Sequence, residues 1–349
     1  MRKLRIMHVL NTGGYSGAEN VVITLINSMK TKVDGYYVSP TGGIVDILTE
    51  NKIKYVPVKG ETISISALRQ AVKIVRPDII HAHDFTAGVI SSISVFGIPI
   101  ISHLHNNSPW LKQISAKSIG YFLSTTRFKK ILTVSDSIMN DYVFGEFLKA
   151  KAKTIGNPIR LQSIRDKAKK SQLTESSDVM FLGRLETPKN PLAFIEIIAG
   201  LKKVFPSIKA AIVGDGMLRN EVEKKITQYV LTNNILLYGF QDNPYGLLQN
   251  TKILCMPSTW EGFGLAAVES LALGKPVVAA PIGGLNDIIT DSCGKKCSTN
   301  DEYIDEILKL LIDSRYYINK SKSALCRAND FDNMESYRKM MISVYKSVL

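Results

Sequence analysis

The segment EGFGLAAVE, residues 261–269, combines glycines with two carboxylates at the expected start of a helix. Its glycines allow the backbone to approach a ligand closely. The amides of Phe263, Gly264 and Leu265 precede the first helical hydrogen bonds, so they are available to bind an anion. The segment therefore predicts a site for a negatively charged ligand.

The two carboxylates of this segment lie eight positions apart. Glu269 falls in an otherwise apolar helix, LAAVESLAL, where a carboxylate requires a partner or a ligand. It is placed to accept hydrogen bonds from a ribose diol, whereas Glu261, between Trp260 and Gly262, is placed to meet a sugar. The alternative is that both are ordinary surface carboxylates.

Two cations follow an earlier apolar run, VMFLGRL. Arg184 and Lys189 are five residues apart on one expected loop. Arginine offers a planar fork and lysine a point charge, so together they suit a diphosphate. A solvated turn is the alternative for this pair.

These residues share a place in the expected fold. Apolar strand candidates alternate with amphipathic helices, which is typical of parallel sheets covered on both faces. In the second half the helices are expected at 190–204, 217–231, 243–250 and 264–273. Ligands of such sheets bind outside the carboxyl ends of the strands. The further residues expected at that edge are Gly183, Gly214, Gly216 and Phe240.

The alternating pattern restarts around TIGNPI, residues 154–159. The sequence therefore predicts an α/β protein of two doubly wound, Rossmann-like domains, at 1–156 and 157–331, that face each other across a cleft. A basic amphipathic helix is expected within 332–349.

The first half carries a glycine loop and four histidines. The loop NTGGYSGAEN matches a dinucleotide fingerprint only loosely, but its amides suit a phosphate or sugar approaching from the other domain. His81, His83, His103 and His105 form two His-x-His pairs whose members share a strand face. A four-histidine metal site is one interpretation. We favour histidines at strand ends, one of which donates a hydrogen bond to substrate.

Charge is distributed unevenly along the chain, whose net charge is +13. Residues 1–160 hold 20 Lys/Arg against 10 Asp/Glu, and the remainder holds 24 against 21. The basic half suggests an anionic partner, unless the charge only aids solubility. No nucleic-acid module is recognisable, so we expect no nucleic acid. The stretch at 112–130 mixes cations with apolar residues and suits an anionic bilayer, or else is an ordinary core helix.

An uncharged stretch and the number of cysteines bear on where in the cell the protein is expected. Residues 85–102 are uncharged, but four serines, Gly88, Gly97 and Pro99 favour a helix followed by a strand over a membrane span. Four scattered cysteines are typical of a reduced, cytoplasmic protein. We expect a cytoplasmic protein, with any contact at the inner face of the cytoplasmic membrane being peripheral.

The chain resembles the retaining, nucleotide-sugar-dependent glycosyltransferases of family 4, which have the GT-B fold. The motifs that carry the resemblance are GGYSGAE, DIIHAHD, PIISHLH, LTVSDSI, IGNPI, FLGRLETPKN, IVGDG, LYGF and PSTWEGFGLAAVESLALGKPVVAAPIGGLNDII. EGFGLAAVE is the E-x7-E pattern of that family. One departure is Asn190 after Lys189, where many members have glycine. The resemblance also implies that the C-terminal helix completes the first domain.

The resemblance implies roles for residues already singled out. Catalytic roles fall on His105, Glu261, Arg184 and Lys189. The residues implied to bind the donor are Gly14, Gly183, Arg184, Lys189, Gly214, Gly216, Phe240, Glu261, Phe263, Gly264, Leu265 and Glu269. Within these sets Glu269 holds the ribose, Glu261 faces the transferred sugar, and the two cations neutralise the leaving diphosphate. His105 lies at the sugar, and the role of His103 is open.

The implied reaction moves a hexose or N-acetylhexosamine from a nucleotide-diphosphate sugar to a glycan acceptor, with retention and without a metal or cofactor. Uridine is the expected nucleotide, and guanosine is next. The acceptor is expected to be a lipid-diphosphate-linked glycan of capsule, exopolysaccharide or O-antigen synthesis, bound by the first domain. Two alternatives are a non-catalytic scaffold subunit of a partner glycosyltransferase and a nucleotide-sugar epimerase or hydrolase of the same architecture.

Overall fold

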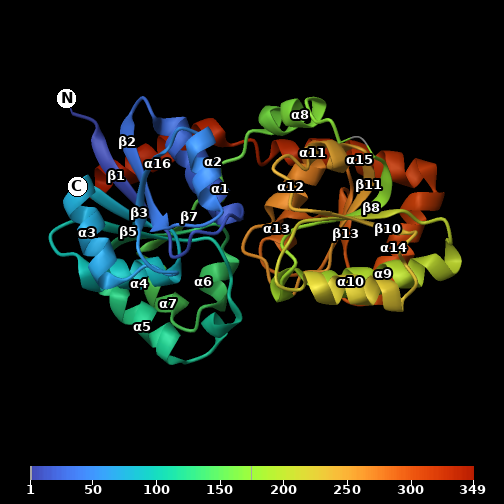
Figure 1. Ribbon diagram of the computed structural model, residues 1–349, viewed down its shortest axis with the longest axis horizontal. Helices are drawn as coiled ribbons and strands as arrows, with labels where there is room; N and C mark the ends of the chain where they lie inside the picture. Colours follow the sequence, from blue (N-terminus) through green and yellow to red (C-terminus); the bar gives the residue numbers. More distant parts are fainter. Residues whose placement is uncertain (1, 174) are drawn as a thin grey trace. The chain divides into compact units, whose positions relative to one another are not determined.

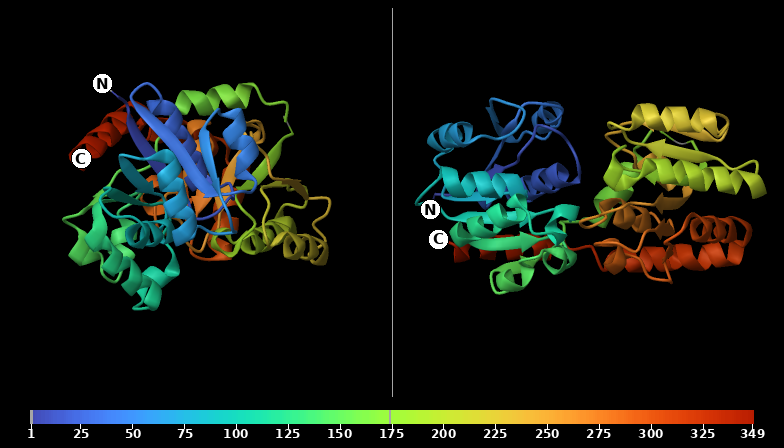
Figure 2. Two further views of the ribbon diagram at one scale, coloured as in Figure 1. Left: turned by 60° about the vertical axis from the view of Figure 1, so that its left-hand side comes forward. Right: turned by 90° about the horizontal axis from the view of Figure 1, so that it is seen from below.

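The protein consists of two compact α/β units. The structure, a computed structural model, describes residues 2–173 and 175–349. One unit comprises residues 2–158 with Met334–Leu349, and the other comprises Ile159–Asn333. In each unit a parallel sheet is covered by helices (Figures 1 and 2). The predicted α/β class, with two doubly wound sheets, is therefore confirmed.

The described part of the first unit contains a seven-stranded parallel sheet in the order β3-β2-β1-β4-β5-β6-β7. Its strands are β1 (Leu4–Val9), β2 (Val33–Pro40), β3 (Lys54–Val58), β4 (Ile79–Ala82), β5 (Ile100–Leu104), β6 (Phe128–Thr133) and β7 (Ala152–Thr154). The central strands are apolar runs with little or no exposure, as expected of strands buried on both faces.

The helices of this unit follow its strands along the chain. They are α1 (Gly17–Met29), α2 (Ile44–Glu50), α3 (Ile65–Val75), α4 (Phe85–Ser94), α5 (Ala116–Ser124), α6 (Ser137–Asp141), α7 (Gly145–Leu148) and α16 (Met334–Ser347). Although α16 comes last in the sequence, its Tyr337, Met341 and Tyr345 are buried in one core cluster with Ile6 of β1 and Ile101 of β5. Figure 1 shows this last helix in red among the blue strands of the first unit.

The second unit repeats the design with a six-stranded parallel sheet within the described residues, ordered β10-β9-β8-β11-β12-β13. Its strands are β8 (Ser177–Leu182), β9 (Ala210–Val213), β10 (Ile235–Gly239), β11 (Thr251–Met256), β12 (Val277–Ala279) and β13 (Gly294–Lys296). Its helices are α8 (Leu161–Lys169), α9 (Pro191–Val204), α10 (Arg219–Gln228), α11 (Tyr245–Gln249), α12 (Leu265–Ala272), α13 (Leu285–Ile288), α14 (Asn300–Ile312) and α15 (Ser314–Asn329). Separate apolar clusters fill the two faces, one under α9, α10 and α14 and the other under α8, α11, α12 and α15.

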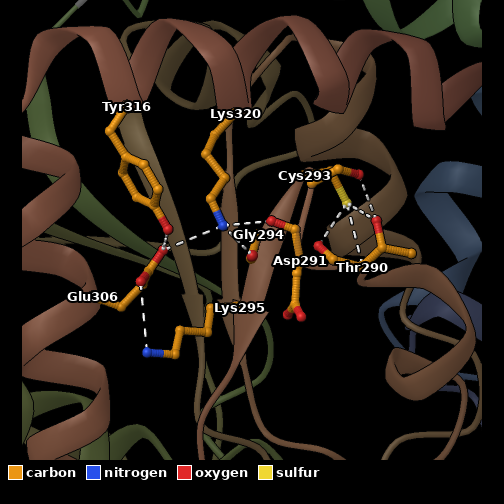
Figure 3. A network of polar contacts seen from close by, with 9 residues as sticks. Thr290, Asp291, Cys293, Gly294, Lys295, Glu306, Tyr316 and Lys320 are labelled. Atoms are coloured by element: carbon orange, nitrogen blue, oxygen red, sulfur yellow. Dashed lines mark hydrogen bonds and ion pairs between the residues drawn. The ribbon is translucent and has the colours of Figure 1, made fainter.

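A buried polar network attaches α14 and α15 to the edge of this sheet (Figure 3). Glu306, only 3% exposed, lies 3.5 Å from the Lys320 ammonium and accepts a 2.8 Å hydrogen bond from the Tyr316 hydroxyl. Lys320 also donates to the carbonyls of Asp291 and Gly294, each at 2.7 Å. The two buried charges are thus paired and hydrogen-bonded, as burial requires.

The basic stretch at 112–130 does not form one helix. It spans a 3₁₀ turn at Pro109–Lys112, helix α5, a second 3₁₀ turn at Thr125–Arg127 and the start of β6. The break before α5 is fixed by Ser115, which caps the helix in a reciprocal capping box with Ser118. The uncharged stretch at 85–102 divides into α4 and β5, and no helix within the described residues is long and apolar enough to cross a membrane.

Candidate active site

The predicted donor-binding residues of the second unit gather at one edge of its sheet. Gly183 follows β8, Gly214 and Gly216 follow β9, Phe240 follows β10, and the segment at 261–265 lies between β11 and α12. Because all these strands are parallel, the residues that follow them share the carboxyl edge, where open α/β sheets bind ligands.

The loops at this edge interlock through glycines. A Cβ on Gly214 would collide with the Gly183 carbonyl, and a Cβ on Gly283 would collide with the Glu261 carbonyl. Backbone hydrogen bonds hold the same loops together, from Thr259 N–H to the Pro188 carbonyl at 2.9 Å and from Leu185 N–H to the Asp215 carbonyl at 2.9 Å. The edge is therefore a connected backbone surface on which side chains are positioned.

Both predicted cations are paired with carboxylates. The Lys189 ammonium forms an ion pair with Glu261, and both side chains are largely buried. Arg184, half exposed, donates to Glu186 at 2.8 Å. The ion pair between Lys189 and Glu261 joins the β8–α9 loop to the β11–α12 loop, so it places a cation at the loop that leads into α12.

Asn190, which stands where many family members have glycine, keeps a backbone conformation that glycine adopts readily. This residue adopts the left-handed conformation, with φ 53° and ψ 54°. Glycine reaches that region without strain, and asparagine is one of the few other residues that enters it readily. Pro191 then opens α9 at the position where proline is favoured. The backbone thus makes the turn that glycine would make.

The start of α12 presents free backbone amides. Gly264 is its N-cap, with φ 106° and ψ 51°, and a glycine offers no side chain to cap the helix. A Cβ at this position would also press against Leu285, so glycine is required by both conformation and space. The first backbone N–H of α12 that has a hydrogen-bond acceptor is that of Ala267, which donates to the Gly264 carbonyl at 3.0 Å. The earlier amides, including that of Leu265, are a suitable anion site.

Glu269 lies on the next turn of α12 and has a partner that the sequence did not reveal. Its Oε1 accepts a 2.8 Å hydrogen bond from the hydroxyl of Tyr245, a buried residue at the start of α11. Burial raises the pKa of Glu269 above its ordinary value, while the Tyr245 bond and the charge of Lys167 oppose that rise. The only available signal for Tyr245 was its place in an expected helix.

The glycine loop of the first unit has two different glycines. A Cβ on Gly13 would collide with the carbonyls of Pro40 and Thr41, so Gly13 is required by packing. Gly14 has no such neighbour; the nearest atom to its hypothetical Cβ is the Thr12 hydroxyl at 3.7 Å. Gly14 therefore exposes its backbone without being needed for the packing of the loop.

The histidines of the first unit form one cluster. His81, His83, His103 and His105 lie together, and the structure adds His8 of β1. His8 pairs in register with His81, so its ring lies on the same sheet face. His105, directly after β5, is partly exposed, whereas the other four rings are buried. No local pattern indicated that His8 joins this cluster, because the pairing of β1 with β4 depends on strand order.

Comparisons with known proteins agree with this architecture. The family model described as Glycosyltransferase Family 4 matches residues 15–163, and the one described as Glycosyl transferases group 1 matches residues 163–324. A relative from Campylobacter jejuni is 25% identical over 94% of this chain and 95% of its own. Its name is GalNAc-alpha-(1->4)-GalNAc-alpha-(1->3)-diNAcBac-PP-undecaprenol alpha-1,4-N-acetyl-D-galactosaminyltransferase. A relative from Escherichia coli, UDP-Gal:alpha-D-GlcNAc-diphosphoundecaprenol alpha-1,3-galactosyltransferase, is 26% identical over 71% of this chain and 69% of its own.

Solved structures share the fold along the whole chain. Anabaena Alr3699/HepE, crystallised with UDP and glucose, superposes with a TM-score of 0.84 at 19% identity, covering 99% of this chain and 100% of that one. Staphylococcus aureus TarM superposes with a TM-score of 0.80 at 13% identity, covering 99% and 100%. The fold is thus GT-B. The chain belongs to the family-4-like glycosyltransferases, and it is an enzyme that transfers a sugar.

Proposed function

We propose that this glycosyltransferase moves a hexose or N-acetylhexosamine from a UDP-sugar to a lipid-diphosphate-linked glycan, with retention of anomeric configuration and without a metal ion. The observation that carries the donor proposal is the carboxyl edge of the second unit. There the Lys189–Glu261 ion pair and the Tyr245-bonded Glu269 lie on either side of the uncapped start of α12.

The proposed chemistry follows from where charge develops. As the glycosyl–phosphate bond breaks, positive charge grows on the sugar and negative charge on the leaving diphosphate. Lys189, Arg184 and the first amides of α12 stabilise the anion, and preorganised donors of this kind are effective because they need no rearrangement. Glu269 accepts from the ribose, and Glu261 lies beside the sugar once the diphosphate attracts Lys189. His105 and Gly14 contribute from the first unit.

The acceptor proposal is supported by the relatives. Both the Campylobacter jejuni and the Escherichia coli enzymes carry undecaprenol diphosphate-linked glycans in their names. We place the reaction in the assembly of a capsule, exopolysaccharide or O-antigen, at the cytoplasmic face of the membrane.

A surface patch of the first unit suits contact with that membrane. Ile119 and Leu123 lie one turn apart on α5, and the Phe122 ring contacts Phe147 of α7 with centroids 6.1 Å apart. Leu123 is 63% exposed and Phe147 is 77% exposed, which is unusual for large apolar side chains. Tyr121, by contrast, is buried and cannot reach a bilayer. Lys117 lies on the same helix as Leu123, and a lysine near the surface would add about 1 kcal/mol of attraction to anionic lipid.

Transfer itself is tested with synthetic polyprenyl-diphosphate glycans and a panel of α-linked UDP-sugars in EDTA. We expect one sugar to add, as measured by mass spectrometry, and the new bond to be α by its NMR coupling. A β bond would contradict retention, and loss of all activity in EDTA would contradict metal independence. Isomerised UDP-sugar formed without acceptor would identify an epimerase instead.

Membrane contact is tested by sedimentation with vesicles of phosphatidylglycerol and phosphatidylcholine. The wild type should sediment with vesicles rich in phosphatidylglycerol, and a Leu123→Ser, Phe147→Ser variant should sediment much less. Ile312→Ser is the matched control, because Ile312 is 67% exposed in the second unit. Equal sedimentation of both variants would exclude the patch as the contact surface.

A further inference from the structure

All five histidines of the chain belong to the cluster at the carboxyl ends of β1, β4 and β5. Such convergence follows from strand register. His8 is level with His81, and members of each His-x-His pair lie on one face, so five imidazoles project from the same side of three adjacent strands. Four of the rings are at most 1% exposed, and His105 lies at the partly exposed end.

Three of these rings are joined by direct hydrogen bonds. His8 Nδ1 lies 2.8 Å from His83 Nε2, and His83 Nδ1 lies 3.0 Å from His105 Nε2. His81 is engaged elsewhere, because its Nδ1 lies 2.9 Å from the Tyr345 hydroxyl of α16. His83 thus uses both nitrogens, one toward the interior and one toward His105.

The three hydrogen-bonded rings of His8, His83 and His105 are neutral at neutral pH. Burial lowers the pKa of His8 to about 3 and that of His105 to about 3, and it lowers the pKa of His83 well below its usual range. A neutral imidazole has one N–H donor and one acceptor nitrogen. If His83 donates to His105, it must accept from His8; if it accepts from His105, it must donate to His8. The three protons therefore shift together or not at all.

We propose that His8 and His83 are positioning residues that fix, through this hydrogen-bonded chain, whether His105 presents a proton or a lone pair at its Nδ1. Because Nε2 of His105 is hydrogen-bonded to His83, the direction of that hydrogen bond decides whether Nδ1 of His105 carries a proton. Its two outer atoms, His8 Nε2 and His105 Nδ1, have no hydrogen-bond partner within the described residues. In either direction one end is an unpaired donor and the other an unpaired acceptor, which costs free energy.

A ligand group that pairs with His105 would therefore select one direction for the whole chain. This catalytic consequence rests on the proposed function, in which His105 lies at the transferred sugar. The hydrogen bonds among His8, His83 and His105 are independent of that function, because they are defined by distances within the first unit.

The geometry favours hydrogen bonding over a shared metal ion. The triads His8, His81, His83 and His83, His103, His105 each bring one nitrogen per ring within 4.8 Å of one another. Two nitrogens on one tetrahedral zinc ion lie about 3.3 Å apart, given a Zn–N distance of about 2.0–2.1 Å. The 2.8 and 3.0 Å separations are shorter than this and match hydrogen bonds.

The direct test is the tautomer of each ring, measured by long-range proton–nitrogen NMR of the full chain labelled with ¹⁵N-histidine. We expect a single tautomer direction along His8, His83 and His105 in the wild type. His8→Phe should change the His105 nitrogen signals, because His8 is connected to His105 through the two hydrogen bonds of His83. His8→Asn, whose amide occupies the position of Nδ1, should restore them.

Tyr345→Phe is the matched control. It removes the hydrogen bond of His81 in the same cluster but leaves the two hydrogen bonds that join His8, His83 and His105. It should leave the His105 signals in place. Unchanged His105 signals in both folded His8→Phe and folded His83→Phe proteins would overturn the proposal. So would one equivalent of zinc in the purified protein whose removal by chelator shifts the histidine signals.

A kinetic measurement separates this proposal from the proposed function. In His8→Phe, turnover should fall about tenfold or more, by analogy with the loss of an orienting partner of a metal-ligating histidine. The KM for the donor should stay within about twofold. If the wild type transfers no sugar, the proposed function fails while the NMR result still decides the hydrogen-bonded chain. Unchanged turnover alongside altered His105 signals would overturn the catalytic consequence alone.

Discussion

Opposing influences act on the protonation of Glu269, the buried carboxylate that we propose binds the ribose. Burial favours its neutral form, while the Tyr245 hydroxyl and the Lys167 charge favour the ionised form. Ionised carboxylates accept the stronger hydrogen bonds, so a ribose diol is held best when Glu269 is charged. In the proposed donor site, Tyr245 would therefore assist binding without contacting the nucleotide.

Tyr245→Phe should make nucleotide binding more sensitive to acid. Removing the hydroxyl raises the pKa of Glu269 further, so affinity for UDP should begin to fall at a higher pH than in the wild type. Calorimetric titration of UDP from pH 8 to pH 5 measures this shift. Tyr229→Phe, at an exposed tyrosine of the same unit, is the control. Superimposable profiles for Tyr245→Phe and wild type would contradict the role of this hydrogen bond.

The sequence predicted which residues belong to the candidate site better than it predicted the side chains that pair with them. The E-x7-E segment begins in the loop after β11 and continues into α12, at the predicted carboxyl edge, because glycines and apolar periodicity are local signals. The Tyr245–Glu269 and Lys189–Glu261 contacts join residues 24 and 72 positions apart. Such pairings depend on how loops pack over the sheet, which no local pattern encodes.

At the scale of elements, apolar periodicity placed the four helices expected at 190–273 within a few residues, whereas α14 and α15 were not predicted. Helix α9, expected at 190–204, spans Pro191–Val204, and α12, expected at 264–273, spans Leu265–Ala272. Residues 112–130 were harder, because serine caps and short turns divide them despite a helix-like composition. Caps are decided by single hydrogen bonds, and periodicity does not detect them.

The contact of α14 and α15 with the sheet edge depends on the network in Figure 3. Lys320→Met should leave Glu306 buried with only the more distant Lys295, 3.8 Å away, as a counter-charge. Losing one partner of a buried pair typically costs about 3–5 kcal/mol. We expect the free energy of unfolding of the second unit to fall by that order in urea titrations.

Lys322→Met is the control for this change, since Lys322 is an exposed lysine of the same helix. The expected cost there is within about 0.5 kcal/mol. If the two variants lose equal stability, the network does not hold α15 to the sheet.

For the whole molecule, the histidine cluster makes the two units respond differently to acid. Folding lowers the pKa of all five histidines, so their stabilising contribution is present above about pH 6.5 and is lost as pH falls. Each costs up to about 1.4 kcal/mol per pH unit below that value. Asp84, whose pKa is raised by burial to about 6, acts in the opposite direction and offsets only part of this.

The first unit should therefore unfold at lower urea concentration at pH 5.5 than at pH 7.5, and the second unit should change less. The two tryptophans allow the unfolding of each unit to be followed separately by fluorescence, because Trp110 lies in the first unit and Trp260 in the second. Fluorescence of Trp260→Phe reports the first unit, and that of Trp110→Phe reports the second. An equal shift of both midpoints would contradict the assignment of acid sensitivity to the histidines.

The most direct measurement of the central claim is calorimetric titration of UDP, GDP and ADP into the protein in EDTA. We predict that UDP binds without metal and that Lys189→Ala weakens it about tenfold or more, because a hydrogen bond to a charged group contributes about 1.5–3 kcal/mol. The matched control is Lys225→Ala, which breaks a partly buried lysine–glutamate pair between α9 and α10, neither of whose residues belongs to the loop of Lys189. Equal UDP affinity in wild type and Lys189→Ala, or binding only with added metal, would contradict the proposed donor site.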